Sequence, residues 1–306
     1  MIVSDPLYAF EGNGLYVNSV TGAVIIFLSI VFLIFHIPVV LLFILNKEFN
    51  KNRAFFIMFL IGLLDCIQLF LQVYDGLILI FGIFLGSVYD GFYRGVLSSL
   101  WDATLILTLL LAYNRFAAIV MDDFSWANSS VIYYFVYFLS IAVVIVGSAM
   151  YNMSLIYYYW IFAYMKPKLR PGPPWPVDLA MQVELYVNWI TMGITGTLYV
   201  IIIVYMFFKS KTQTIRKEWS LAIQAFIVSL FFILTSTTFD VIPNNLLADS
   251  LLVFYILKVT WQLVNMVNCV VYLIFNMRLR RAYINFWRTG SFNENQKWSV
   301  AIVVSV

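Results

Sequence analysis

Seven long apolar runs constrain the fold of this chain more than any other feature of its sequence. A helix needs about 20 mostly apolar residues to cross the hydrocarbon core of a bilayer. The runs lie at residues 20–45, 54–79, 95–121, 130–152, 185–208, 219–242 and 251–275. Of the 306 residues, 63% are hydrophobic and 11% are charged, whereas about a quarter of a soluble domain is charged. The sequence therefore predicts an all-α membrane protein with a seven-transmembrane helix bundle.

One segment leaves open whether the chain has an eighth transmembrane span. The stretch SLIYYYWIFAY, at residues 154–164, follows the fourth run and contains aromatic residues but no charge. It either lengthens the fourth helix, lies at the membrane interface, or crosses the membrane as a further span. An eighth span would place both termini on the same side, whereas seven spans place them on opposite sides.

The basic residues favour an extracellular N-terminus and a cytosolic C-terminus. Cytosolic loops are enriched in Lys and Arg. Residues 1–19 contain neither, whereas two loops and the tail on the opposite side contain many; the loop at 153–184 is a partial exception. We expect residues 276–306 to be a cytosolic tail that begins with a short amphipathic helix. The basic residues on the predicted cytosolic side are Lys47, Lys51, Arg53, Lys209, Lys211, Arg216, Lys217, Arg278, Arg280, Arg281 and Arg288.

The chemistry of enzymes is not visible in the sequence. His36 is the single histidine, and there is no HExxH, no glycine-rich phosphate loop and no Ser/His/Asp set. Cys66 and Cys269 lie inside apolar runs, which makes a disulfide framework or a zinc site a poor interpretation. The net charge of +3 comes from scattered clusters without a continuous basic face. We expect no catalytic activity, no cofactor and no nucleic-acid partner.

A group of polar residues is expected to meet near the middle of the membrane. Asp65 lies in the second run at a depth similar to Thr104 in the third, and Asn265 and Asn268 lie in the seventh. A carboxylate at this depth is expensive unless it has partners. Two interpretations remain open: a structural hydrogen-bonded cluster with a protonated Asp65, or a polar site for ordered water or an ion such as sodium.

The third run carries an arginine at its predicted cytosolic end. Arg115 follows Asn114 in the stretch LLAYNRFAAIV. One interpretation is a side chain that reaches the lipid phosphates, and the other is a group that holds neighbouring helices or a cytosolic partner. Steps of three or four residues place five side chains on one face of this helix: Trp101, Thr104, Thr108, Leu111 and Arg115.

These residues resemble features of rhodopsin-like G-protein-coupled receptors. LLAYNRFAAIV resembles the Asp-Arg-Tyr region at the end of their third helix, and Asp65 matches the acidic residue of their second helix. NCVVY is similar to their Asn-Pro-x-x-Tyr motif, with Asn268 and Tyr272 kept and Cys269 in place of the proline. This resemblance implies a sodium ion at Asp65 in the resting state and a coupling role for Arg115.

A closer resemblance is to the nematode serpentine chemoreceptors, most of all to class T, with class X as the nearest competitor. The similar segments are FFIMFLIGLLDCIQLF, LLAYNRF and TWQLVNMVNCVVYLIFNMRLRR, and the resemblance covers residues 20–283. Two features depart from the receptor pattern. SVYDGFYRGV, at the start of the third span, has no cysteine to tether an outer loop, and the sixth run lacks a Cys-Trp-x-Pro sequence.

The resemblance implies a multi-pass chemosensory receptor of the plasma membrane, in a sensory cilium, that activates a heterotrimeric G protein. The low charge and many rings favour a small, largely apolar ligand in the outer half of the bundle. The alternatives are a small transporter, a ligand-gated channel, or a protein of assembly or trafficking. The candidate ligand-binding residues are Leu97, Trp101, Lys258 and Trp261, unless the two tryptophans are core packing. The candidate G-protein coupling residues are Asn114, Arg115, Lys211, Arg216, Lys217 and Tyr272.

Overall fold

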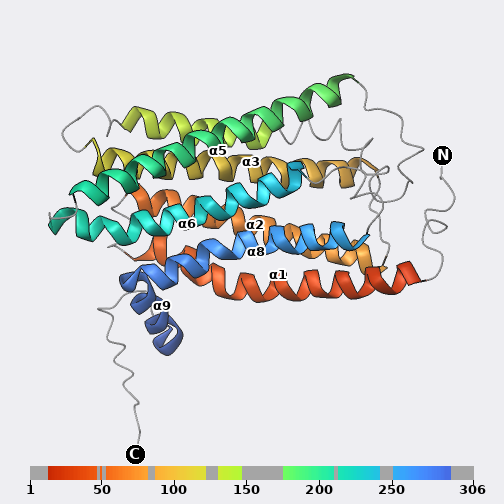
Figure 1. Cartoon of the computed structure of the whole chain (residues 1–306). Coiled ribbons are helices and arrows are strands. Elements are labelled where there is room, and N and C mark those ends of the chain that lie inside the picture. Colours follow the sequence, from red (N-terminus) through yellow and green to blue (C-terminus); the bar gives the residue numbers. More distant parts are fainter. Residues whose placement is uncertain are drawn as a thin grey trace, which may run out of the picture.

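All regular elements that a computed structural model of the chain describes are helices. The structure describes residues 13–46, 49, 53–81, 87–121, 130–146, 175–209, 213–241 and 251–290. The long helices run side by side in one bundle (Figure 1). A short helix, α9, follows them. The helices of the bundle are α1 (Asn13–Leu45), α2 (Arg53–Phe81), α3 (Ser87–Ile119), Ser130–Val146, α5 (Trp175–Lys209), α6 (Gln213–Val241) and α8 (Leu251–Phe275).

The predicted all-α membrane fold is confirmed. Five described helices are long and apolar enough to cross a membrane, and two shorter apolar helices, Ser130–Val146 and Ala222–Thr238, bring the set to the predicted number. The helices α1, α3 and α5 begin before their apolar runs, because the polar residues that flank a span can continue its helix beyond the hydrocarbon core. Residues 147–152 of the fourth run and the aromatic segment 154–164 lie outside the described residues.

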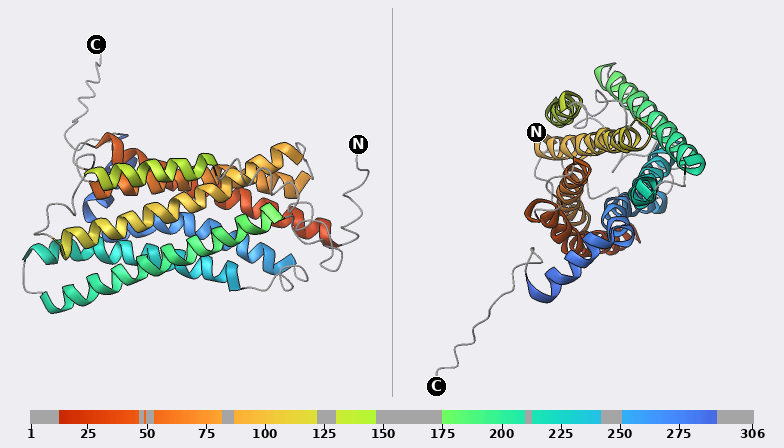
Figure 2. Two further views of the ribbon diagram at one scale, coloured as in Figure 1. Left: turned by 90° about the horizontal axis from the view of Figure 1, so that it is seen from above. Right: turned by 90° about the vertical axis from the view of Figure 1, so that its left-hand side faces the viewer.

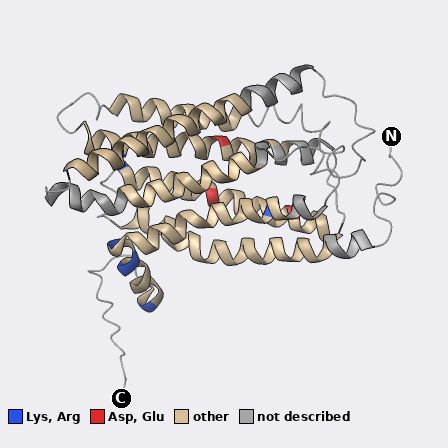
Figure 3. Cartoon of the chain, viewed as in Figure 1, with Lys and Arg blue, Asp and Glu red and all other residues tan. Residues whose placement is uncertain are grey.

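The outer surface of the bundle is apolar. Large side chains such as Phe27, Phe70 and Phe207 are more than half exposed on their helices. Figure 3 shows few charged residues along the bundle, while basic residues gather on α9. A soluble protein does not leave so much apolar area in contact with water, so this surface faces lipid tails. The interior instead holds many buried polar side chains.

α1 and α2 pack closely through a pair of glycines. A Cβ atom on Gly22 would lie 2.6 Å from the carbonyl oxygen of Gly76, and one on Gly76 would lie 2.7 Å from the carbonyl oxygen of Gly22. Such distances are shorter than real Cβ contacts, so only glycine allows the two backbones to approach this far. Helix interfaces in membranes favour small residues for this reason, since van der Waals packing replaces the hydrophobic effect as the driving force.

α9 (Met277–Thr289) lies across one end of the bundle, where it packs against α8 and α1 (Figure 2). Asn276 caps its start by accepting a hydrogen bond from the Leu279 backbone N–H at 3.1 Å, and Gly290 ends it with φ of 69°. Leu279 and Ala282 are buried against the bundle. The opposite face is basic and exposed, which confirms the predicted amphipathic helix. We call this part of the bundle the α9 end.

Gly76→Ala is expected to lower the thermal unfolding midpoint of the purified protein in lipid nanodiscs. The added methyl group has no space against Gly22, and overpacking of this kind typically costs about 1–3 kcal/mol. Gly193→Ala in α5 is the matched control, because a Cβ atom there meets nothing within 4 Å. Equal midpoints for the two variants would contradict the close contact.

Candidate functional site

Two facing helices line the interior with polar and aromatic side chains. On α2, Asp65, Gln68, Gln72 and Asp75 recur at steps of three or four residues and are all buried. The same spacing on α8 brings its own inward residues to a single face, and α8 runs antiparallel to α2 (Figure 1). Among the described residues, three side-chain contacts between these faces define what we call the α2–α8 ladder. Its pairs are Asp75 with Lys258, Gln68 with Trp261, and Asp65 with Asn268.

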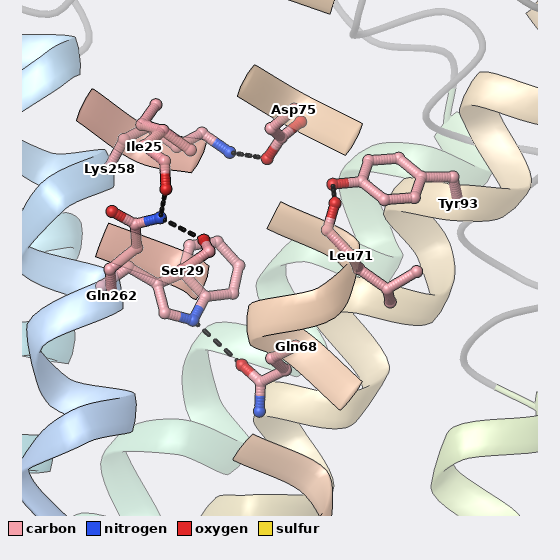
Figure 4. Close-up of polar contacts among 9 residues, drawn as sticks. Ile25, Ser29, Gln68, Leu71, Asp75, Tyr93, Lys258 and Gln262 are labelled. Carbon is pink, nitrogen blue, oxygen red and sulfur yellow. Dashed lines mark hydrogen bonds and ion pairs between the residues drawn. The ribbon is translucent and has the colours of Figure 1, made fainter. Parts of the chain in front are cut away.

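The pair farthest from the α9 end is ionic. Lys258 Nζ donates a hydrogen bond to Asp75 Oδ2 at 3.0 Å, and the two side chains are 14% and 5% exposed (Figure 4). The ammonium also lies 5.4 Å from the centre of the Trp261 ring, within range of a cation–π interaction. The sequence predicted Lys258 as a single polar anchor for a ligand. Its charge is compensated by an α2 carboxylate, and the role of Lys258 toward a ligand stays a prediction.

An aromatic cluster occupies the middle pair of the ladder. The Trp101 and Trp261 rings meet edge to face with centroids 5.4 Å apart, and Phe232 of α6 lies 5.1 Å from Trp101. Leu97, the remaining candidate for ligand binding, is buried on α3. These contacts bring α3, α6 and α8 together at one level. The predicted ligand residues therefore come from helices that meet.

Gln68 connects this cluster to α3. Its Oε1 accepts a hydrogen bond from Trp261 Nε1 at 3.0 Å, and its Nε2 donates to Thr104 Oγ1 at 3.3 Å. Thr104 Oγ1 in turn donates to the Leu100 carbonyl at 2.8 Å. The sequence placed Thr104 with Asp65; the structure joins its hydroxyl to Gln68, which in turn binds Trp261. Gln68 was missed, although its position three residues after Asp65 on the same face was a usable signal.

Asp65 is fully buried at the third pair. Asn268 Nδ2 donates to Asp65 Oδ2, and His36 Nε2 lies 3.9 Å from the same oxygen. His36 was missed because nothing in a single sequence shows which residue of α1 packs at this depth. Asn265 is buried nearby on the same face of α8, with no hydrogen-bond partner among the described residues.

The oxygens around Asp65 fit a hard cation or ordered water. Asp65 Oδ1, Asn265 Oδ1 and Asn268 Oδ1 are buried and accept no hydrogen bond from the described residues. Carboxylate and amide oxygens of this kind suit sodium or a water molecule with several polar partners. The described residues contain no group of three or more His, Cys, Asp or Glu side chains that suits a metal held by such ligands.

At the α9 end, Arg115 starts a short chain of hydrogen bonds to two uncharged side chains. Its Nη2 donates to Asn114 Oδ1 at 3.0 Å, and Asn114 Nδ2 donates to the Tyr133 hydroxyl at 2.8 Å. Arg115 is 3% exposed and Asn114 is 7% exposed. Tyr133 comes from the helix Ser130–Val146 and was not predicted. Its ring is also covered by the Arg53 guanidinium at 4.9 Å.

Of the other coupling candidates, the structure describes the side chain of Tyr272 only. Tyr272 is fully buried on α8, and Tyr199 is fully buried on α5. Arg216 and Lys217 lie at the start of α6, where the side chains are outside the described set. Lys211 lies outside the described residues.

The chain matches one family model over almost its whole length. The model is described as serpentine type 7TM GPCR chemoreceptor Srt, and it matches residues 13–296. No curated protein matches the chain.

Removing one member of the ionic pair is expected to destabilise the bundle more than neutralising both. Lys258→Met leaves the buried Asp75 carboxylate without its cation, which typically costs about 3–5 kcal/mol. The double variant Lys258→Met/Asp75→Asn removes both charges and should recover most of the thermal unfolding midpoint in nanodiscs. A double variant as unstable as the single one would show that charge compensation is not the basis of the pair.

Proposed function

Because the chain belongs to the serpentine type 7TM GPCR chemoreceptor Srt family, we propose that it binds a small molecule in one half of the bundle and activates a heterotrimeric G protein at the α9 end. One observation carries the proposal: the α2–α8 ladder extends from the tryptophan pair towards Tyr272 at the α9 end. A ligand that changes the contacts of α8 far from the α9 end therefore acts on the same helix that carries Tyr272, one of the coupling candidates.

The ligand site in this proposal is bordered by Leu97, Trp101 and Trp261. The Lys258–Asp75 pair borders it on the side farther from the α9 end. Two indole rings supply flat apolar walls, and a few polar groups set the orientation of a small molecule. The alternative role of the tryptophans is core packing, in which case their truncation would change stability and leave the ligand response unaltered.

The proposed orientation places the α9 end in the cytosol. The exposed arginines of α9 and Arg53 at the start of α2 support it, because basic residues concentrate on the cytosolic side of membrane proteins. The N-terminus is then extracellular, and the plasma membrane of a sensory cell, in its cilium, is the proposed location. Lipid headgroups are the partners proposed for the arginines of α9.

Coupling in this proposal depends on the release of Arg115. In the resting bundle of this proposal, Asn114 Oδ1 holds the guanidinium by accepting a hydrogen bond from Arg115, and Tyr133 in turn holds Asn114 by accepting one from its amide. A ligand that favours a second arrangement of the helices shifts the population towards it and exposes Arg115 to the G protein. Arg216, Lys217 and Lys211 are proposed to border the same cytosolic opening, near Tyr272.

Asp65 is proposed as a second regulatory site, which sodium or ordered water occupies in the resting state. The unpaired oxygens of Asp65, Asn265 and Asn268 support it. A cation that binds the resting bundle more tightly than the active one opposes the ligand by linkage. The rival is a protonated Asp65 in a purely structural cluster.

Arg115→Ala is expected to abolish ligand-stimulated nucleotide exchange on the G protein while binding of the same ligand is unchanged. The measurement uses purified receptor in nanodiscs with a panel of small volatile compounds. Arg288→Ala, an exposed arginine of α9, is the matched control and should retain exchange. Full exchange by Arg115→Ala would contradict the coupling role. Ligand-dependent current across a bilayer without a G protein would favour the channel alternative.

Sodium is expected to raise the thermal unfolding midpoint of the wild type relative to potassium at equal ionic strength. Binding to the folded state alone stabilises it by mass action. Asp65→Asn keeps an oxygen at the site but removes the charge, so its midpoint should not depend on the cation. A wild type that unfolds at the same temperature in both salts would leave the structural cluster as the explanation of Asp65.

A further inference from the structure

Gln72 is a buried amide whose hydrogen-bonding atoms are both unused. Its side chain is 2% exposed, and neither Nε2 nor Oε1 has a hydrogen-bond partner among the described residues. Two other glutamines of the interior do make hydrogen bonds, although Oε1 of Gln262 is unpartnered among the described residues. Gln68 uses both ends, and Gln262 donates from Nε2 to the Ile25 carbonyl at 3.0 Å and to Ser29 Oγ at 2.7 Å.

The position of Gln72 places it inside the α2–α8 ladder. It lies one helical turn from Asp75 on one side and one turn from Gln68 on the other, and both of these residues bind α8. Figure 4 shows these two contacts at successive levels of the interface. The unused amide therefore lies at the level between the ionic pair and the indole of Trp261.

An unused amide in an apolar interior is unfavourable. Burying an amide without a hydrogen bond costs about 1–3 kcal/mol, and the lipid around this bundle supplies no partner. A group that occupies this level can recover that free energy if it accepts a hydrogen bond from the amide N–H and donates one to the amide oxygen. The partner of Gln72 must therefore carry both a hydrogen-bond donor and a hydrogen-bond acceptor.

The charges beside Gln72 restrict the partner further. Asp75 and Lys258 compensate each other at 3.0 Å. An anionic ligand would have to separate Lys258 from Asp75 and leave the carboxylate buried without its cation, and a cationic ligand would do the reverse. Either change is strongly unfavourable, whereas a neutral ligand leaves the pair intact.

We propose that Gln72 recognises the head group of the ligand, and that the ligand is a neutral amphiphile with a carboxamide or hydroxyl head and an apolar body. The head exchanges two hydrogen bonds with the Gln72 amide, and the apolar body lies against Trp101 and Trp261. This inference rests on the ligand site of the proposed function, but it does not depend on the G protein.

The test measures ligand-induced shifts of the thermal unfolding midpoint for purified full-length receptor in nanodiscs. The probes are hexanamide, hexanol, N,N-dimethylhexanamide, hexane and hexanoate, with the same heads on butyl to decyl chains. Hexanamide and hexanol should bind roughly tenfold more tightly than the other three, since one net hydrogen bond is worth about one decade of affinity. Equal binding of hexanoate, or no preference at any chain length, overturns the proposal.

Gln72→Leu should remove the preference for hexanamide over hexane. Gln224→Leu is the matched control, because Gln224 is an equally buried glutamine that donates to Met58 Sδ elsewhere in the bundle. It should keep the preference of the wild type. An unchanged preference in Gln72→Leu overturns the proposal and leaves a bound water as the partner of this amide.

Asp75→Asn tests the charge argument by an expected increase in the affinity for hexanoate. Without the α2 carboxylate, Lys258 has an uncompensated charge beside the same site, so hexanoate should bind this variant roughly tenfold more tightly than it binds the wild type. If the variant does not fold, the Gln72→Leu comparison decides alone. If it folds and hexanoate gains nothing, the argument from charge compensation is overturned.

Nucleotide exchange on the same samples separates this inference from the proposed function. A head-group preference without any exchange supports the inference and removes the G-protein function. Ligand-stimulated exchange with no head-group preference supports the function and overturns the inference.

Discussion

The structure depends on one constraint: a polar group inside a bilayer needs a partner, either within the protein or in a molecule bound to it. The α2–α8 ladder follows from it, because the carboxylates of Asp65 and Asp75 and the amide of Gln68 all have partners on α8. Each such pair ties two helices at a defined depth and fixes their register. Apolar packing alone would allow neighbouring helices to slide, since lipid tails solvate Leu and Phe as well as another helix does.

The same constraint brings a row of the proposed functional residues to the inward face of α8. Its inward face carries a lysine, a tryptophan, two asparagines and a tyrosine between Lys258 and Tyr272. Lys258, Trp261 and Asn268 contact α2 directly. Trp261 also reaches α3, both through its ring contact with Trp101 and through Gln68. A helix with polar contacts at several depths responds as a unit, because a shift that breaks one contact strains the next. This arrangement suits the transfer of a ligand signal along the membrane normal.

The sequence predicts the helical bundle well and its internal contacts only in part. Long apolar runs determine the spans, and three- and four-residue steps bring Trp101 and Thr104 to the interior. Steps along one helix cannot show which residue of another helix lies opposite. His36 beside Asp65 and Tyr133 beside Asn114 were therefore missed, and Lys258 was assigned to a ligand before its partner on α2 was known.

The glycine contact between α1 and α2 joins these two helices into one close-packed pair. Gly22 and Gly76 bring the two backbones so close that rotation or sliding of either helix would cause collisions between main-chain atoms. Any rearrangement of the bundle would therefore keep α1 and α2 together, as a stator relative to which the other helices shift. In the proposed function, a ligand bound between this pair and α8 would displace α8, α3 and α6 relative to it, so that the direction of the proposed motion would be set far from the proposed G-protein contact.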